Sequence, residues 1–315
     1  MNIEEIKYFC RQYLSITQSW EDRRIEIPQE EVGRLSESIG GIHLGFLGLE
    51  YNYNRNHRVH WMTPDSLELF KQNKEDPIKL KCLQHFGWIN EKGVPTDIQY
   101  NLNSDGFRID CEDYEEEGIV FYGCSNTFGM GVHNEDTFAQ RVSKHFNLAC
   151  YNFGVSGVGL DVAAIHALFL LRAKVKRPKA IVVMCPPPRR WSWFVDDRIM
   201  TISSQDFDET IGRKNSDSME FQSVLNDMNN MVQMTKNLVS LQLVAEELNV
   251  PLILTSARYG DKLHHFPSWP MYKFYLDRGI DSFDGISMGR DLQHPGVETH
   301  KYWAEIIIKL IKEKL

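Results

Sequence analysis

Short apolar runs alternate with longer segments of helical spacing in the second half of the chain. The apolar runs cover 118–123, 148–154, 179–185 and 250–256. Because these runs are apolar throughout and do not alternate, they are typical of a parallel sheet that is covered on both faces. Apolar residues spaced for helices predict the connecting and closing helices at about 136–146, 160–175, 219–248 and 298–314. We therefore expect a three-layer α/β/α sandwich with a mostly parallel sheet.

The first part of the chain lacks this alternation. Its apolar residues come in short pieces broken by Gly, Pro, Asn and charged residues. Helices are predicted at 3–18 and after the sequence TPDSLELFKQN, where Thr63 or Asp65 would cap the helix. No linker rich in Pro, Gly or Ser follows, so we expect an N-terminal extension (1–117) packed on the α/β domain (118–315).

Composition narrows the classes of partner. The 315 residues carry a net charge of -8, and 42% of them are hydrophobic, which gives no basic field for nucleic acid or anionic lipid. The uncharged stretch VAAIHALFLL is far shorter than the roughly 18 residues that span a bilayer. The N-terminus MNIEEIKYFC lacks a signal pattern, and the six cysteines show no paired spacing. We expect a cytoplasmic protein with reduced cysteines and no membrane or nucleic-acid partner.

The stretch FYGCSNTFGMG places one hydroxyl, Ser125, directly after the first apolar run. In parallel sheets, functional groups gather in the loops that follow the carboxyl ends of the strands. A serine in this position is either a helix cap or a nucleophile. A nucleophilic serine needs a base within hydrogen-bond reach and a third group that orients the base.

The stretch GRDLQHPGVETH offers both partners. Asp291 and His294 are three residues apart, just before the last predicted helix. Residues three apart in a turn lie within about 7 Å by Cα, so their side chains can meet. Asp291 would then hold one imidazole nitrogen while the other faces Ser125.

Three blocks, GCSNTFG, NFGVSGVG and DLQHPG, resemble in this order the blocks of the SGNH (GDSL-like) hydrolase family. The resemblance covers about 118–315 and implies a flavodoxin-like α/β/α fold, in agreement with the apolar pattern. It implies that Ser125 is the nucleophile, His294 the base and Asp291 its orienting carboxylate. It also implies an oxyanion hole that includes the N–H groups of Ser125 and Gly157. Cys124 stands where the family has Asp.

The family has a further block, Gly-x-Asn-Asp, between the second and the last of these three. It has no counterpart in this chain. The corresponding strand is followed by Pro186, Pro187 and Pro188, and proline has no backbone N–H to donate. Loss of one oxyanion donor lowers rates by about 100- to 1000-fold. Asn126, or an arginine after the prolines, is the candidate replacement.

Several residues are candidates for substrate binding. Arg189, Arg190 and Trp191 follow the third strand, at the same sheet edge as Ser125, where they could recognise an anion, a sugar ring or an acyl chain. Packing of this loop against its own domain is the alternative. Arg108, in YNLNSDGFRID, either binds a substrate anion or pins the extension by donating to backbone carbonyls. His166 is expected in the core.

The proposed chemistry requires neither a metal nor an organic cofactor. The pair His264-His265 has no carboxylate or cysteine at ligand spacing, so a zinc site is not supported. No GxGxxG sequence opens a helix after a strand, so the glycines do not form a dinucleotide fingerprint.

These patterns together predict a serine esterase that acts through an acyl-enzyme on a small-molecule or carbohydrate ester. The resemblance to the family, and no particular residue, favours a short acyl group such as an O-acetyl. An O-acyltransferase with the same three residues is an alternative. A non-catalytic binding module that retains the fold is a second alternative, because the Gly-x-Asn-Asp block is missing.

Overall fold

The computed structural model describes residues 58–62, 64–103, 105–110, 114–168, 175–186, 190–195, 198–203, 227–258, 279–281 and 287–314. Several predictions fall outside these described residues. They concern the helix at 3–18, Thr63 as a cap, the prolines at 187 and 188, Arg189, and the pair His264-His265.

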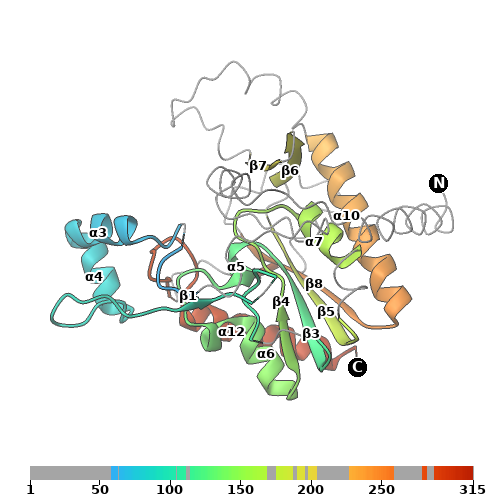
Figure 1. Ribbon diagram of the computed structural model, residues 1–315, viewed down its shortest axis with the longest axis horizontal. Coiled ribbons are helices and arrows are strands. Elements are labelled where there is room, and N and C mark those ends of the chain that lie inside the picture. Colours follow the sequence, from blue (N-terminus) through green and yellow to red (C-terminus); the bar gives the residue numbers. More distant parts are fainter. Residues whose placement is uncertain are drawn as a thin grey trace, which may run out of the picture.

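The centre of the protein is a five-stranded sheet in the order β4-β3-β5-β8-β9 (Figure 1). Every neighbouring pair in it is parallel. The strands are β3 (Glu117–Gly123), β4 (Ala149–Asn152), β5 (Arg177–Cys185), β8 (Leu252–Arg258) and β9 (Gly279–Asp281). The apolar runs that predicted strands correspond to β3, β4, β5 and β8.

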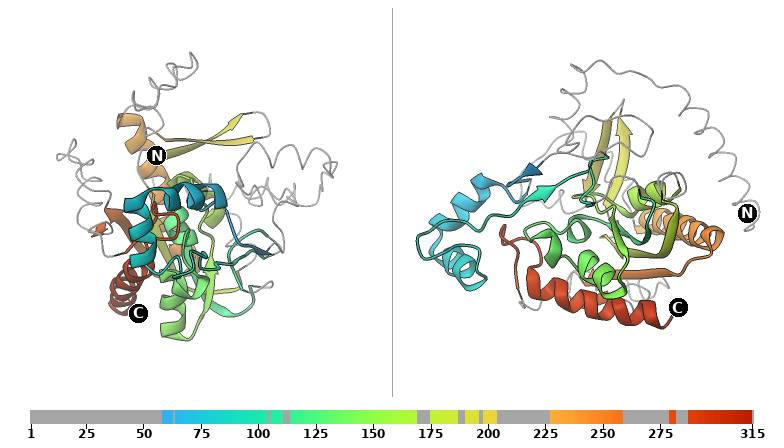
Figure 2. Two further views of the ribbon diagram at one scale, coloured as in Figure 1. Left: turned by 90° about the vertical axis from the view of Figure 1, so that its left-hand side faces the viewer. Right: turned by 60° about the horizontal axis from the view of Figure 1, so that its bottom comes forward.

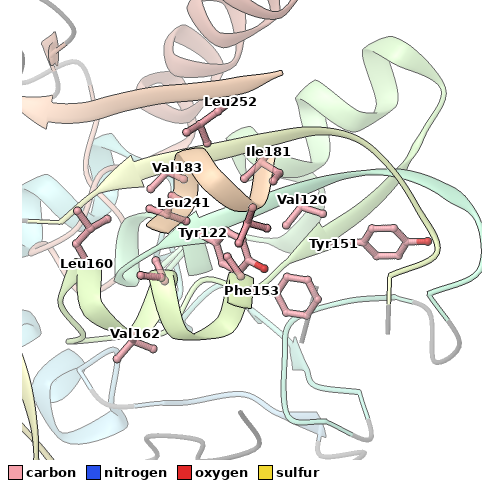
Figure 3. Close-up of a cluster of buried hydrophobic side chains, with 14 of the residues drawn as sticks. Val120, Tyr122, Tyr151, Phe153, Leu160, Val162, Ile181, Val183, Leu241 and Leu252 are labelled. Atoms are coloured by element: carbon pink, nitrogen blue, oxygen red, sulfur yellow. The ribbon is translucent and has the colours of Figure 1, made fainter. Parts of the chain in front are cut away.

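Helices cover both faces of the sheet, which confirms the three-layer architecture. One face carries α7 (Leu160–His166) and α10 (Asp227–Leu248), and the other carries α6 (Phe138–Phe146) and α12 (Val297–Lys312) (Figure 1). Along β3, Val120 and Tyr122 point into the core on the α7 and α10 side (Figure 3). Ile119 and Phe121 point into the core on the α6 and α12 side. Both faces of the strand are therefore apolar.

A side-chain cap explains where α6 begins, and apolar spacing explains the buried face of α12. Thr137 caps α6 by accepting from the Gln140 N–H, and the preceding turn forms the 3-10 helix η2 (Asn134–Asp136). The helix therefore begins at Phe138, two residues after the predicted start. Five residues of α12 are predicted to point inward: Trp303, Ile307 and Ile311 are fully buried, whereas Ile306 and Leu310 are partly buried.

The described part of the extension forms two helices and a small antiparallel ladder. Its elements are β1 (Arg58–Val59), α3 (Leu67–Glu75), α4 (Pro77–His85) and β2 (Tyr100–Asn101). Ser66 caps α3 by accepting from Leu69 N, so the prediction of Asp65 as the cap is wrong. The Asp65 side chain is instead buried in an ion pair.

Residues 58–103 pack against one end of the α/β domain (Figure 2). Their apolar side chains form one cluster with the segment that follows Ser125 and with the loop before α12. Its buried members are Phe70, Leu83, Trp88, Ile89, Ile98, Tyr100, Leu102, Phe128, Met130 and Val132, and Leu292 and Val297 pack against them.

The remaining described elements are short. A four-residue helix, α5 (Ser125–Phe128), follows β3, and β6 (Arg190–Val195) pairs antiparallel with β7 (Arg198–Ser203). Within the described residues, no helix is both long and apolar enough to cross a bilayer.

Candidate active site

A sharp turn at the end of β3 presents Ser125. At Gly123, φ is +155° and a Cβ would lie 2.7 Å from the Met184 carbonyl oxygen of β5, so only glycine fits this close approach. Cys124 is the N-cap residue of α5 and Ser125 its first helical residue. The serine is therefore not the helix cap, which was the competing interpretation.

The structure brings Ser125, His294 and Asp291 into one hydrogen-bonded chain. His294 Nε2 lies 2.8 Å from Ser125 Oγ, and His294 Nδ1 lies 2.5 Å from Asp291 Oδ2. A carboxylate can only accept, so Nδ1 carries the proton. Nε2 is then free to accept the proton of the serine hydroxyl. This tautomer is the one that general-base catalysis requires.

Asp291 is held as a carboxylate inside the protein. It is 1% exposed, and its Oδ1 accepts from the backbone N–H groups of Gln293 and His294, both at 3.0 Å. Burial by itself would raise the pKa of Asp291, but the hydrogen bond and charge of His294 and the two backbone donors outweigh it. The net pKa lies below the usual value. Asp291 therefore stays negative and can stabilise an imidazolium.

The end of β4 and the loop that follows it contact α5. Asn152 Nδ2 donates to the Thr127 carbonyl at 2.8 Å, and a Cβ at Gly154 would lie 2.5 Å from Phe128 N. Gly157 follows in an exposed turn with φ +82°, a conformation that favours glycine. The predicted tight turn at the second block is thus present, next to α5.

The candidate oxyanion donors lie at the start of α5 and in this turn. Ser125 is the first residue of α5, where backbone N–H groups have no acceptor within the helix. Asn126 is the next residue and is buried. Pro186 is buried directly after β5 and has no N–H. The residue that directly follows β5, where the missing Gly-x-Asn-Asp block would begin, therefore offers no backbone N–H donor.

Two of the predicted substrate contacts can be placed only in part. Arg190 is half-buried at the start of β6, and its carbonyl oxygen lies so close to Gly159 that a Cβ there would clash. The start of β6 thus packs against the N-terminus of α7. Trp191 belongs to β6, but its side chain is outside what the structure describes.

Of the two roles predicted for Arg108, the structure shows the bonds to backbone carbonyls, and its burial is at odds with a substrate contact. It is completely buried, and its guanidinium donates to the carbonyls of Gly129 at 2.6 Å and Val132 at 2.9 Å, and more weakly to those of Phe128 and Gln99. Burial lowers the pKa of Arg108 to about 10. The Arg108 side chain fixes the segment that follows α5.

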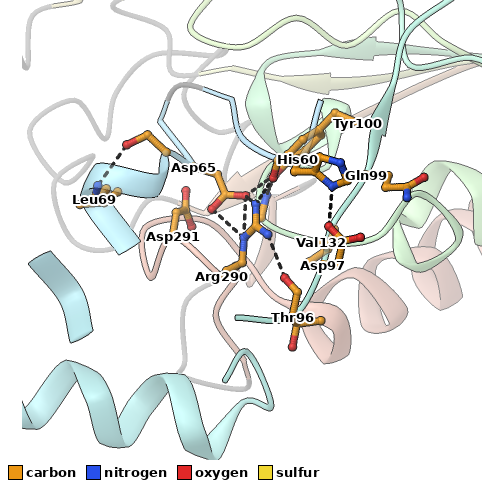
Figure 4. A network of polar contacts seen from close by, with 12 residues as sticks. His60, Asp65, Leu69, Thr96, Asp97, Gln99, Tyr100, Val132, Arg290 and Asp291 are labelled. Carbon is orange, nitrogen blue, oxygen red and sulfur yellow. Dashed lines mark hydrogen bonds and ion pairs between the residues drawn. The ribbon is translucent and has the colours of Figure 1, made fainter. Parts of the chain in front are cut away.

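An ion pair beside the site was not predicted from the sequence. Arg290 precedes Asp291, is fully buried, and donates through Nη2 to Asp65 Oδ2 at 2.7 Å (Figure 4). Its position inside GRDLQHPG, one residue before the carboxylate, was the available signal. The partner residue lies 225 positions earlier and shares no pattern with it.

His166 is buried against Phe107 and Tyr122, as expected for a core histidine. Among the residues that the structure describes, no group of three or more His, Cys, Asp or Glu could hold a metal ion.

No protein-family model matches this chain, and no curated protein matches it. Similar solved structures include a carbohydrate esterase family 2 enzyme with a carbohydrate-binding domain from Corynascus thermopiles (Myceliophthora fergusii), at 15% identity and a TM-score of 0.36. That match covers 62% of this chain and 65% of the enzyme, slightly under two thirds of its length.

An acetyl xylan esterase from the rumen bacterium Butyrivibrio proteoclasticus matches at 14% identity and a TM-score of 0.39, over 70% of this chain and 68% of that one. A third structure, described as a carbohydrate esterase with divergent catalytic and non-catalytic binding functions, matches at 11% identity and a TM-score of 0.30, over 72% and 69%. Similarity at this level does not identify the reaction of this chain.

Proposed function

We propose that this protein is a serine esterase of the SGNH type that cleaves a short acyl ester through an acyl-enzyme. The observation that carries the proposal is the continuous chain from Ser125 Oγ through the His294 ring to Asp291, with heavy-atom distances of 2.8 and 2.5 Å. A nucleophile, a base within reach and a buried carboxylate that orients the base are the parts that acyl transfer needs.

The first half of the reaction forms the acyl-enzyme. Ser125 Oγ attacks the acyl carbonyl carbon while its proton passes to His294 Nε2. Asp291 stabilises the imidazolium without taking the proton. The tetrahedral intermediate then collapses, the bond to the leaving alcohol breaks, and Nε2 returns the proton to that alcohol.

The second half repeats these steps with water. His294 Nε2 accepts a proton from a water molecule, whose oxygen attacks the acyl carbonyl. Collapse releases the carboxylic acid and returns the proton to Ser125 Oγ. The oxyanion formed in both halves is stabilised by the N–H groups of Ser125 and Gly157. Asn126 is the candidate third donor, because Pro186 stands where a donor loop would follow β5.

A short acyl group, such as an O-acetyl on a carbohydrate, is the substrate class that the family resemblance of the three sequence blocks implies. Arg190 and Trp191, which follow β5, are the candidates for contact with the alcohol portion.

Hydrolysis of activated acetyl, butyryl and octanoyl esters tests this proposal, with Ser125→Ala as the loss variant. Ser240→Ala, which removes a hydroxyl on α10 outside the site, is the matched control. We expect turnover that decreases with acyl length, disappears in Ser125→Ala and is unchanged in Ser240→Ala. Turnover that requires an added alcohol or sugar would instead identify an acyltransferase. Carbohydrate binding without turnover, unaffected by Ser125→Ala, would identify a binding module.

A further inference from the structure

The loop that carries Asp291 and His294 is bonded on one side to the extension. This loop, residues 287–296, directly precedes α12 and lies outside the sheet. Residues 58–103 contact it through buried polar groups at several points, and each point lies within three residues of Asp291.

The strongest contact is the Arg290–Asp65 ion pair (Figure 4). Arg290 Nη2 and Nε donate to the Asp65 carboxylate at 2.7 and 3.2 Å, and both residues are 0% exposed. The guanidinium also donates to the carbonyls of His60 and Thr96 and lies 3.7 Å from the centre of the Trp61 ring. Each of these described partners of the guanidinium belongs to the extension. A buried charge with this many partners has a fixed position.

The extension also holds the backbone of the loop. Asn73 Nδ2, on α3, donates to the Asp291 carbonyl at 3.1 Å, and Trp88 Nε1 donates to the Met288 carbonyl at 2.7 Å. These bonds fix the main chain on both sides of Arg290.

Tyr100 connects the same network to the nucleophile side. Its hydroxyl donates to Asp65 Oδ2 at 2.5 Å and accepts from Gly131 N at 2.9 Å. The Gly131 carbonyl accepts from Arg290 N at 2.9 Å. The segment after Ser125 and the loop of His294 are therefore joined through Tyr100, Asp65 and Arg290.

The loop also contains strained backbone. Leu292, between Asp291 and His294, has φ +55°, a left-handed conformation that is rare for a bulky side chain. Such conformations persist only where surrounding contacts hold them. Leu292 packs against the apolar cluster of the extension, which includes Phe70 and Trp88. The extension thus supplies part of the packing that holds the strained residue, and Phe128, Met130 and Val132 of the same cluster supply the rest.

We infer that residues 58–103 are a positioning part of the active site. Asp65 acting through Arg290, together with Asn73 and Trp88, sets the place of Asp291 and His294 relative to Ser125. This inference rests on the proposed function, because it assigns the extension a role in the reactivity of that serine. A misplacement of about 1 Å at a reacting group can lower rates by about 100-fold.

The test compares variants that loosen the loop with a matched control. Asp65→Leu combined with Arg290→Met removes both charges of the buried pair, a replacement that is often tolerated by the fold. Asn73→Leu removes the donor to the Asp291 carbonyl, and Gln72→Leu makes the same kind of change at the exposed neighbouring position of α3. Wild type, these variants and Ser125→Ala are treated with a fluorophosphonate.

Two readouts separate positioning from general loss of structure. The first is the rate constant of phosphonylation, which describes the folded molecules alone. The fraction of molecules that are folded is measured separately, by the final extent of labelling. The second is the downfield proton resonance of His294 Nδ1–H, which reports the short bond to Asp291. We expect the double variant and Asn73→Leu to label completely but at least about 10-fold more slowly, with a weakened or shifted downfield resonance. Gln72→Leu should match wild type in both.

The outcomes distinguish the inference from the proposed function. A labelled wild type with unchanged rate and resonance in the double variant and in Asn73→Leu would overturn the positioning role and leave the esterase proposal intact. A lower extent of labelling at the wild-type rate would also overturn it, because it shows a stability effect alone. An unlabelled, folded wild type would overturn the proposed function and the positioning role with it.

Discussion

The two halves of the candidate site are built in different ways. Ser125 follows β3, a central strand whose neighbours and two apolar clusters hold it from every side. Asp291 and His294 lie in a loop outside the sheet, which is bonded to residues between 194 and 230 positions earlier in the chain. One half depends on apolar packing, and the other on a few buried polar pairs.

This difference predicts different responses to substitution. Apolar packing around β3 also holds the whole domain together, so changes at the Ser125 turn should lower the free energy of unfolding. The polar contacts of the 287–296 loop orient two side chains, so changes there should lower the rate of the folded protein. Substitutions on the two sides of the site should therefore separate in their effects on rate and on stability.

The largest effect is expected for Asp291→Asn. The amide oxygen can still accept from the N–H groups of Gln293 and His294, so the loop should keep its shape. The amide nitrogen cannot accept from His294 Nδ1–H, which favours the wrong tautomer, and the rate should fall about 10,000-fold. Hydrolysis of an activated acetyl ester and thermal unfolding measure the two effects. A rate loss below about tenfold would contradict the assigned role.

Substitution of two glycines by alanine tests how tightly packing constrains the backbone on the Ser125 side of the site. A Cβ at Gly123 would meet the Met184 carbonyl, so Gly123→Ala should lower the free energy of unfolding by more than about 2 kcal/mol. Gly157 has nothing within 4 Å of a Cβ, so Gly157→Ala should cost only the backbone strain, about 1 kcal/mol. Denaturant unfolding measures both. Equal costs would show that the β5 contact does not constrain the turn.

His300 links the start of α12 to α6 and should make stability depend on pH. Its Nδ1 accepts from Phe138 N at 3.1 Å. Burial, with smaller contributions from Arg108, Arg141 and His294, lowers the pKa of His300 to about 3. Below the unfolded value of about 6.5, the unfolded chain binds a proton that the folded protein does not, so stability falls as pH falls. Between pH 7 and pH 5 this residue should remove about 2 kcal/mol.

Unfolding measured at both pH values in wild type and His300→Asn isolates this contribution. The asparagine oxygen can replace Nδ1 as the acceptor for Phe138 N and does not titrate, so the pH dependence should shrink by that amount. His145→Asn, at an exposed position of α6, is the control and should leave the dependence unchanged. An unchanged dependence in His300→Asn would show that this histidine is not held neutral.

The smallest effect is expected at an exposed ion pair, which provides a baseline for the buried one. Lys179 Nζ lies 2.9 Å from Glu117 Oε1, at the amino end of β3 and β5, and both side chains are about 45% exposed. Water screens such a pair, so Glu117→Gln should leave the free energy of unfolding nearly unchanged. Thermal unfolding measures this change. A cost comparable to that of breaking Arg290–Asp65 would mean that burial does not set the value of these pairs.

The sequence predicted the sheet side of the protein well, because apolar periodicity reports burial directly. The strands β3, β4, β5 and β8 and the inward face of α12 followed from it. The three side chains that meet at the site were identified by their blocks, and the structure places them in contact. Their chemical roles stay a prediction.

The polar side of the site could not be predicted in the same way. Asp65 was interpreted as a helix cap, since Asp before an apolar run commonly is one, whereas its carboxylate pairs with Arg290 across the chain. Asn73 and Trp88 each form one long-range bond to a carbonyl, and such a bond leaves no pattern in the neighbouring sequence. Contacts of this kind are set by tertiary structure alone.

The proposed esterase depends on Ser125 being a nucleophile that His294 activates. Fluorophosphonate labelling read by intact mass tests it most directly, on wild type, Ser125→Ala and His294→Ala. The account predicts one adduct on wild type, none on Ser125→Ala and little or none on His294→Ala. A folded wild type that takes no adduct, or an adduct that persists in Ser125→Ala, would contradict it.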